Sequence, residues 1–209
     1  QEQGGQRDGV KREETGENTE TSCLVVQYHN IYGYIKDQES LAKATRSQGA
    51  LLEFSADPTA RGMFRPPGHY GADRVTGEGQ PLGIPISYGG PYLGLFATKQ
   101  EYIRQMPSRL SGRTVDSQGR TGYVLTLQTR EQHIRRERAT SNICTAQALP
   151  ANIASMYAVY HGPDGLRQIG GRVHAQAKAL ANGLRQLGQA VESEHFFDTI
   201  TVALGQAAE

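Results

Sequence analysis

The order strand, helix, strand near the start of the apolar part of this chain limits the folds that it can adopt. Residues 23–27 read CLVVQ and residues 50–54 read ALLEF, two short apolar runs that are typical of strands. Between them, Asp37 is suited to begin a helix over DQESLAKATRSQ, which Gly49 would end. Strands joined by a crossover helix usually pair in parallel. The pattern therefore predicts an α/β fold whose sheet is mostly parallel.

Composition separates the first 21 residues from the rest of the chain. They hold a single aliphatic side chain, Val10, among charged, amide and glycine residues. Such a segment cannot bury enough apolar area to offset the entropy that ordering costs. We expect residues 1–21 to form a disordered arm. The remainder of the 209 residues is long enough to bury a sizeable core.

Several later segments carry the pattern of a strand or a helix. The expected strands are 92–97 (YLGLFA), 122–128 (GYVLTLQ) and one that begins in 196–204 (FFDTITVAL), and the expected helices are a short one through 99–106 capped by Thr98, one over about 145–160 with Pro150 in its first turn or at a kink, and one over 163–188. In 163–188 apolar residues recur at steps of three and four up to Gly188. The segment 107–120 is too polar and too rich in glycine to predict either kind of element.

Charge and apolar runs limit the classes of function. Lysine and arginine number 22 against 21 aspartate and glutamate, so a nucleic-acid site would need a local basic patch. The chain shows neither the apolar run of a secretory signal nor 18 consecutive apolar residues, and we expect a soluble, intracellular protein without a membrane partner. Cys23 and Cys144 lack the spacing of a metal or redox motif, so buried thiols are expected.

A glycine-rich loop at 77–90, GEGQPLGIPISYGG, is the first candidate site. It matches neither the dinucleotide-binding fingerprint nor the phosphate loop with its GK[ST] ending. Taken alone, it predicts a structural loop that needs positive φ angles and a close approach of the backbone.

A cluster of basic residues at 127–145, LQTREQHIRRERATSNICT, is the second candidate site. Its basic side chains are Arg130, His133, Arg135, Arg136 and Arg138, with Glu131 and Glu137 between them. The i,i+4 spacing of Glu131 and Arg135 favours a solvated, salt-bridged helical face. The alternative is a patch that binds anions or nucleic acid. The other histidines have no carboxylate or cysteine at metal-ligand spacing, so no metal site is expected.

Three stretches resemble one known family. GEGQPLGIPISYGGPYLGLFATK, RQMPSRLSGRTVD and LTLQTREQHIRRERATSNICTAQAL are similar to the pyridoxal-phosphate-dependent glycine decarboxylases, the P-proteins of the glycine cleavage system. The similarity is to the N-terminal half of these proteins, or to the separate first subunit of bacteria that split them. It runs from about Ser22 to about Thr201 and omits the part that normally opens this half, so a fragment is expected.

The resemblance implies part of a fold-type I aminotransferase-like large domain. That domain has a mixed, mostly parallel sheet with crossover helices and leads into the start of a small C-terminal domain. The implied division is a large domain at 22–160, with a linking helix and the start of the small domain at 161–209. A short edge strand is expected near DRVT (73–76), and 92–97 would be the one antiparallel strand.

The resemblance also implies that this half lacks a catalytic residue. The catalytic half of the family carries a Schiff-base lysine five residues before the proline of its Ile-Pro pair, and that position is Gln80 here. An amide nitrogen cannot form an imine with an aldehyde. The carboxylate that faces the pyridine nitrogen would fall on Ser55, or on Asp57 if the register shifts by two. No cofactor is therefore expected on this chain alone, and pyridoxal phosphate would be held by the catalytic half.

As a function, the resemblance implies glycine decarboxylation with transfer of the aminomethyl group to the lipoyl arm of H-protein. This chain would be the non-catalytic half, cytoplasmic in a bacterium or in the mitochondrial matrix of a eukaryote. If a helix begins by Thr129, Arg130, His133 and Arg136 share the face expected to contact the catalytic half. Alternatives are a stand-alone pyridoxal phosphate enzyme and a nucleic-acid-binding module that uses the Arg130–Arg138 cluster.

Two positions depart from the pattern of the family. Arg74 stands where an aliphatic strand residue is expected, and Pro150 stands in a helix that normally has none. A buried arginine without a partner would cost several kcal/mol.

Overall fold

The computed structural model describes residues 21–106, 109–139 and 145–204. The chain divides into two compact units, which we call the sheet unit (1–97 and 150–209) and the hairpin unit (98–149). The disordered arm expected at 1–21 lies outside the described residues except for Thr21, and so does Cys144. The domain boundary expected between residues 160 and 161 stays a prediction.

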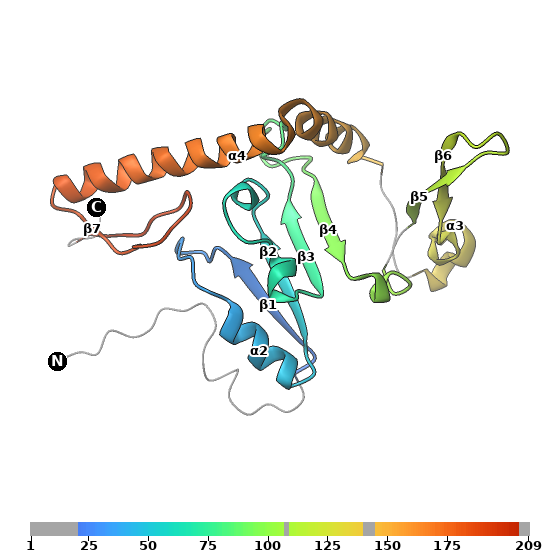
Figure 1. Cartoon of the computed structure of the whole chain (residues 1–209), viewed down its shortest axis with the longest axis horizontal. Helices are drawn as coiled ribbons and strands as arrows, with labels where there is room; N and C mark the ends of the chain where they lie inside the picture. The colour runs from blue at the N-terminus through green and yellow to red at the C-terminus, as the bar shows by residue number, and fades with distance from the viewer. Residues whose placement is uncertain (1–20, 107–108, 140–144, 205–209) are drawn as a thin grey trace. The chain divides into compact units, whose positions relative to one another are not determined.

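A four-stranded sheet forms the centre of the sheet unit (Figure 1). In spatial order its strands are β1 (Cys23–Tyr28), β2 (Leu51–Ala56), β3 (Arg74–Glu78) and β4 (Gly94–Thr98). The first three pair in parallel, whereas β4 runs against β3 (Figure 1). The amide of Gly79 donates to the carbonyl oxygen of Leu93 at 2.6 Å beside this antiparallel pair. The mixed, mostly parallel sheet is confirmed. The expectation of an edge strand near DRVT is wrong, because β4 covers the outer side of β3.

The expected crossover helix is α2 (Glu39–Ser47). Its first turn is held by Asp37, whose Oδ1 accepts a hydrogen bond from the Glu39 amide at 3.3 Å. The chain leaves the helix at Gly49, which has a φ of +70°. Two short 3-10 turns, η1 (Ala60–Gly62) and η2 (Pro67–Tyr70), lie between β2 and β3. The local start and stop residues thus give the helix its predicted length.

One face of the sheet packs the main core. Its buried members are Val26, Tyr28, Ala42, Leu52, Phe54, Tyr70 and Ala72. Phe54 is fully buried, with its ring centroid 5.9 Å from that of Tyr28 and 6.0 Å from that of Tyr70. The inward side chains alternate along β1 and β2, as a strand with one covered face requires.

The other face of the sheet is polar and partly open. Val25 is 58% exposed there. Arg74 is 34% exposed, and its Nη1 lies 3.9 Å from Oε2 of Glu53 on the neighbouring strand. The expected cost of an unpaired, buried arginine therefore does not arise, since this side chain has both a partner and access to water.

The long helix α4 (Ala148–Gln186) consists of two helical segments. They meet at Gly162, whose φ of 61° and ψ of −178° are not helical. Pro163 follows this break and so begins the second segment, where its fixed φ and missing N–H are tolerated. Pro150 is the third residue of the helix and is buried. Both expected helices are confirmed, and Pro150 lies in a first turn.

After α4 the chain returns to the loop that follows β1. Ser193 is fully buried, and its hydroxyl donates to the carbonyl oxygen of Tyr32 at 3.1 Å. The hydroxyl of Thr201 donates to the same oxygen at 2.9 Å, and the Ile35 amide donates to the His195 carbonyl oxygen at 3.0 Å. Only two-residue strands flank this segment, β7 (Ala190–Val191) and β8 (Val202–Ala203). The longer strand expected from 196–204 is therefore wrong, because backbone groups here bond to the 30–35 loop instead.

The hairpin unit contains a β-hairpin that the sequence did not predict. β5 (Leu110–Val115) pairs antiparallel with β6 (Thr121–Thr126). Asp116 closes the turn, since its Oδ1 accepts from the amides of Gln118 and Arg120 at 2.8 and 2.9 Å. The short helix expected through 99–106 is wrong as well. Only the 3-10 turn η3 (Gln100–Tyr102) forms there, and Thr98 ends β4.

Candidate functional site

A cavity of about 250 Å³ lies at the carboxyl ends of β1, β2 and β3. We call it the strand-end cavity. Its lining residues are Gln27, Tyr28, His29, Ser55, Ala56, Asp57, Pro58, Gly77, Glu78 and Pro81. Open α/β sheets bind their ligands at this edge. The structure thus brings Ser55 and Asp57, both predicted site residues, into one cavity.

The two carboxylates of the strand-end cavity already serve as backbone acceptors. Oδ1 of Asp57 accepts hydrogen bonds from the amide and the hydroxyl of Thr59, both at 2.7 Å. Oε1 of Glu78 accepts from the amides of Gln80 and Leu93 at 2.9 and 3.0 Å. These carboxylates hold the loops that follow β2 and β3.

Gln80 fastens the glycine-rich loop to itself. Its side-chain Nε2 donates to the carbonyl oxygen of Ile84 at 2.5 Å, and the Ile84 amide donates back to the Gln80 carbonyl oxygen at 3.1 Å. Ile84 is buried with Leu93 and with Ala154 of α4. The loop also needs Gly83, because its φ is +87° and a Cβ there would lie 2.8 Å from the Tyr157 ring. These contacts agree with the prediction of a structural loop.

The residues of the strand-end cavity do not fit pyridoxal phosphate. The phosphate of such a cofactor needs cationic or N–H donors, whereas the charged lining residues are Asp57 and Glu78. Covalent attachment needs an amine, whereas Gln80 offers an amide that is already bonded to Ile84. We therefore derive no chemical step on this chain through the cofactor.

His29 enters the strand-end cavity with a partner that sequence spacing could not indicate. Its Nε2 lies 3.2 Å from Oδ1 of Asp198, and its Nδ1 is buried without a hydrogen-bond partner among the described residues. The hydrogen bond from His29 is the main cause that holds the pKa of Asp198 below its usual value, against burial, which raises it. The two residues lie 169 positions apart, so only the folded chain joins them.

The lowered pKa of Asp198 predicts a pH dependence of stability. A carboxylate with a depressed pKa contributes stability above its unfolded pKa, about 3.9, and this contribution is lost as the pH falls through the lower folded value. We expect Asp198→Asn to lose stability at neutral pH and to show a shallower decline below about pH 4. Urea unfolding midpoints measured from pH 6 to pH 3 would check this. Parallel curves for the two proteins would contradict it.

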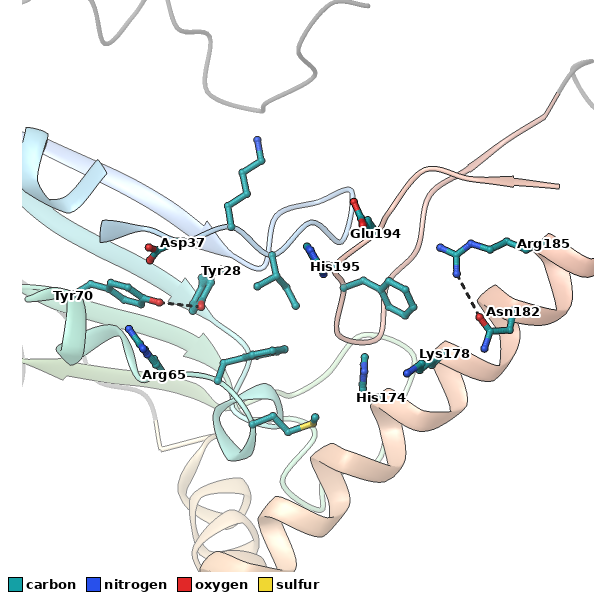
Figure 2. Close-up of a pocket in the computed structure, with 15 residues that line it drawn as sticks. Tyr28, Asp37, Arg65, Tyr70, His174, Lys178, Asn182, Arg185, Glu194 and His195 are labelled. Atoms are coloured by element: carbon teal, nitrogen blue, oxygen red, sulfur yellow. Dashed lines mark hydrogen bonds between the residues drawn. The ribbon is translucent and has the colours of Figure 1, made fainter. Parts of the chain in front are cut away.

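A larger cavity of about 740 Å³ lies beside the C-terminal half of α4 (Figure 2). Tyr28 and Tyr70 form one wall, and His174, Lys178 and Arg185 project from α4 toward it (Figure 2). Burial is the main cause that raises the pKa of Tyr28 to about 12, so its hydroxyl keeps its proton at neutral pH. The hydroxyls of the two tyrosines lie 3.5 Å apart. This cavity mixes cationic, acidic and aromatic groups, and it contains none of the predicted site residues.

The basic cluster does not form the single helix that the sequence indicated. Three short turns replace it, namely η4 (Gln128–Arg130), α3 (Gln132–Arg135) and η5 (Arg136–Arg138). Glu131 is extended and Arg136 has a φ of +52°, so the helix is interrupted twice. The i,i+3 face expected for Arg130, His133 and Arg136 is therefore wrong as a geometric argument.

The side chains of the basic cluster have different surroundings. Arg130 is partly buried, and its Nη1 donates to the carbonyl oxygens of Ile103 and Arg104 at 3.2 and 3.1 Å. His133 and Arg136 are exposed. Arg130 thus holds the hairpin unit together, while His133 and Arg136 are accessible.

Metal and membrane sites are not found in the described ranges. Within them, no group of three or more histidine, cysteine, aspartate or glutamate side chains could hold a metal ion. No helix there is long and apolar enough to cross a membrane. Cys23 is a free, partly buried cysteine.

Comparison with known proteins identifies one family. The family profile described as "Glycine cleavage system P-protein" matches residues 6–209. A glycine dehydrogenase (decarboxylating) of Nostoc punctiforme is 52% identical over 181 residues, which are 87% of this chain and 18% of that protein. A probable glycine dehydrogenase (decarboxylating) subunit 1 of Sphingopyxis alaskensis is 51% identical over 193 residues, which are 91% of this chain and 43% of that protein. The chain thus spans less than half the length of the curated relatives that it matches.

Solved structures agree in fold. The chain is similar to a glycine decarboxylase (P-protein) of the glycine cleavage system in inhibitor-bound form, with a TM-score of 0.84 and 42% identity over 90% of this chain and 44% of that one. An alanine–glyoxylate aminotransferase from Nostoc sp. matches with a TM-score of 0.52 at 16% identity, over 90% of this chain and 47% of that one, which shows a shared fold alone. The aminotransferase-like fold class is confirmed.

Proposed function

Because the chain belongs to the glycine cleavage system P-protein family, we propose that it is a non-catalytic half of a glycine decarboxylase and acts through a catalytic half. The observation that carries the proposal is Gln80, whose side chain closes its own loop on Ile84 and supplies no amine. The sheet, the loop and the strand-end cavity keep the form of the family. The chemistry of the cofactor requires groups that the cavity does not offer.

The whole enzyme, under this proposal, decarboxylates glycine on pyridoxal phosphate and transfers the aminomethyl group to the lipoyl arm of H-protein. The catalytic half holds the cofactor, and the present chain holds none. The relative from Sphingopyxis alaskensis, whose name designates a subunit 1, supports a two-part assembly. We place the protein in the cytoplasm of a bacterium or in the mitochondrial matrix of a eukaryote.

The contact with the catalytic half includes the basic cluster. His133 and Arg136 are exposed and can reach acidic or phosphate groups of the partner. Arg130 supports the contact by fixing the backbone at Ile103 and Arg104. All three residues that the sequence suggested therefore remain proposed interface residues, in two different roles.

Cofactor capture by the purified chain tests the proposal. Mixed with pyridoxal phosphate, the chain should show no internal-aldimine absorbance, and borohydride should fix no adduct within residues 77–91, because that segment has no lysine. Adducts on Lys36 or Lys99 serve as the background control. Glycine decarboxylation should appear only after a catalytic half is added. Decarboxylation by this chain alone would instead support a stand-alone enzyme.

A further inference from the structure

The hairpin unit has no apolar core within its described residues. From 98 to 106, from 109 to 139 and from 145 to 149, the only buried residue is Glu131, which is 3% exposed. Both hydrophobic clusters of the structure lie outside this unit. A two-stranded hairpin is at best marginally stable in water without a surface to pack on. Some other surface must therefore supply the packing that stabilises this unit.

One face of the hairpin carries large exposed apolar side chains. Cross-strand pairing puts Ser111 opposite Leu125, Arg113 opposite Tyr123 and Val115 opposite Thr121, and alternation along each strand puts all six on one face. On this face Val115 is 64% exposed, Tyr123 is 72% exposed and Leu125 is 52% exposed. We call it the tyrosine face. A cluster of this kind marks a protein contact more often than an ordinary surface does.

The hairpin unit is also strongly basic. It holds nine of the 22 lysine and arginine residues and four of the 21 aspartate and glutamate residues, a net charge of +5, so the rest of the chain carries −4. On the tyrosine face itself the charged residue is Arg113. The surface that covers this face should therefore be apolar at its centre and acidic at its rim.

We propose that the tyrosine face is the docking surface for an apolar, acid-rimmed patch on the catalytic half of the decarboxylase. This inference rests on the proposed function and names the surface through which it acts. The chain spans 18% to 43% of the curated relatives described above, so most of the family's surface belongs to segments outside this chain. Two copies of a unit with a charge of +5 repel each other, which disfavours a second copy as the occupant. Tyr123 and Arg113 are residue types that dominate such contacts.

Adjacent residues of β6 provide a matched test. Leu125 on the tyrosine face and Val124 on the opposite face are 52% and 49% exposed. In the full chain, we expect Leu125→Ser and Tyr123→Ser to weaken the dissociation constant for a purified catalytic half by about tenfold or more. Val124→Ser should change it by less than about threefold. Arg113→Glu should slow association, and the slowing should fade as salt rises.

Each outcome of this experiment decides the proposal. Equal losses for Leu125→Ser and Val124→Ser, or no loss for either, would overturn the tyrosine face while the proposed function stands. No binding of the wild-type chain to the catalytic half would overturn both. A lower melting temperature of the isolated Leu125→Ser chain, by more than about 4 °C relative to Val124→Ser, would show that the face packs on the chain itself.

Two further measurements cover a folding defect and a nucleic-acid ligand. Amide hydrogen exchange of the wild-type chain should slow across 110–126 when the catalytic half is added, and unchanged exchange would overturn the proposal without any variant. A single-stranded oligonucleotide is the competing probe. If Arg113→Glu abolishes oligonucleotide binding while Leu125→Ser leaves binding to the catalytic half intact, the surface serves nucleic acid instead.

Discussion

Replacing Phe54 with alanine will lower the free energy of unfolding by about 3–5 kcal/mol, because the cavity left in the core cannot refill. Phe54 is fully buried and contacts the rings of Tyr28 and Tyr70. Chemical denaturation of the two proteins, followed by far-ultraviolet circular dichroism, measures the difference. Because β2 also carries Ser55 to the strand-end cavity, the same change should disturb that cavity.

Phe96→Ala is the matched control for this prediction. Phe96 lies in β4 and is 49% exposed, so removing its ring should cost about 1 kcal/mol or less. If both phenylalanine variants lose equal stability, the core on the α2 side of the sheet does not hold the fold together.

Replacing Gly33 with alanine will detach the C-terminal segment from the loop after β1. Gly33 has a φ of +80°, and a Cβ there would overlap the carbonyl oxygen of Thr199. We expect a loss of about 3 kcal/mol or more, from a left-handed backbone and a displaced Thr199 together. Limited proteolysis of the 193–201 segment and the denaturation midpoint would both report it.

Gly49→Ala separates the two causes of that loss. Gly49 has a φ of +70°, but a Cβ added there would meet no atom of the described residues within 4 Å. Its alanine variant therefore loses stability only through the left-handed backbone, by about 1–2 kcal/mol. A Gly33 variant that is no less stable than the Gly49 variant would mean that the Thr199 contact is dispensable.

The elements that sequence predicted best are those with a strong local cause. α2 follows Asp37 and ends before Gly49, and the break in α4 falls at the Gly162 and Pro163 pair. The hairpin was missed because Gly112, Gly119 and Gly122 lower the strand propensity of 110–126. Its strands depend on cross-strand pairing and on the turn that Asp116 closes, and a scan along the chain does not register either.

The candidate site was predictable only where one residue type decides the chemistry. The position of Gln80 came from a family resemblance, and its amide excludes an imine in any fold. The His29 and Asp198 pair needs the whole chain to form, so no local pattern indicates it. The basic cluster was expected to be one helix because Glu131 and Arg135 have helical spacing, whereas the positive φ of Arg136 interrupts it.

The bond from Ser193 to Tyr32 joins residues 161 positions apart, and the bond from Thr201 to Tyr32 joins residues 169 positions apart. On a ribosome, Tyr32 is therefore made long before the residues that complete its surroundings, and the whole hairpin unit is translated in the interval. Closing such a long loop is entropically costly, and contacts of this separation slow folding. The sheet unit must wait, with its β1 loop uncovered, until synthesis has passed Thr201, and a chaperone that shields apolar strands during that interval would raise the yield of the folded chain.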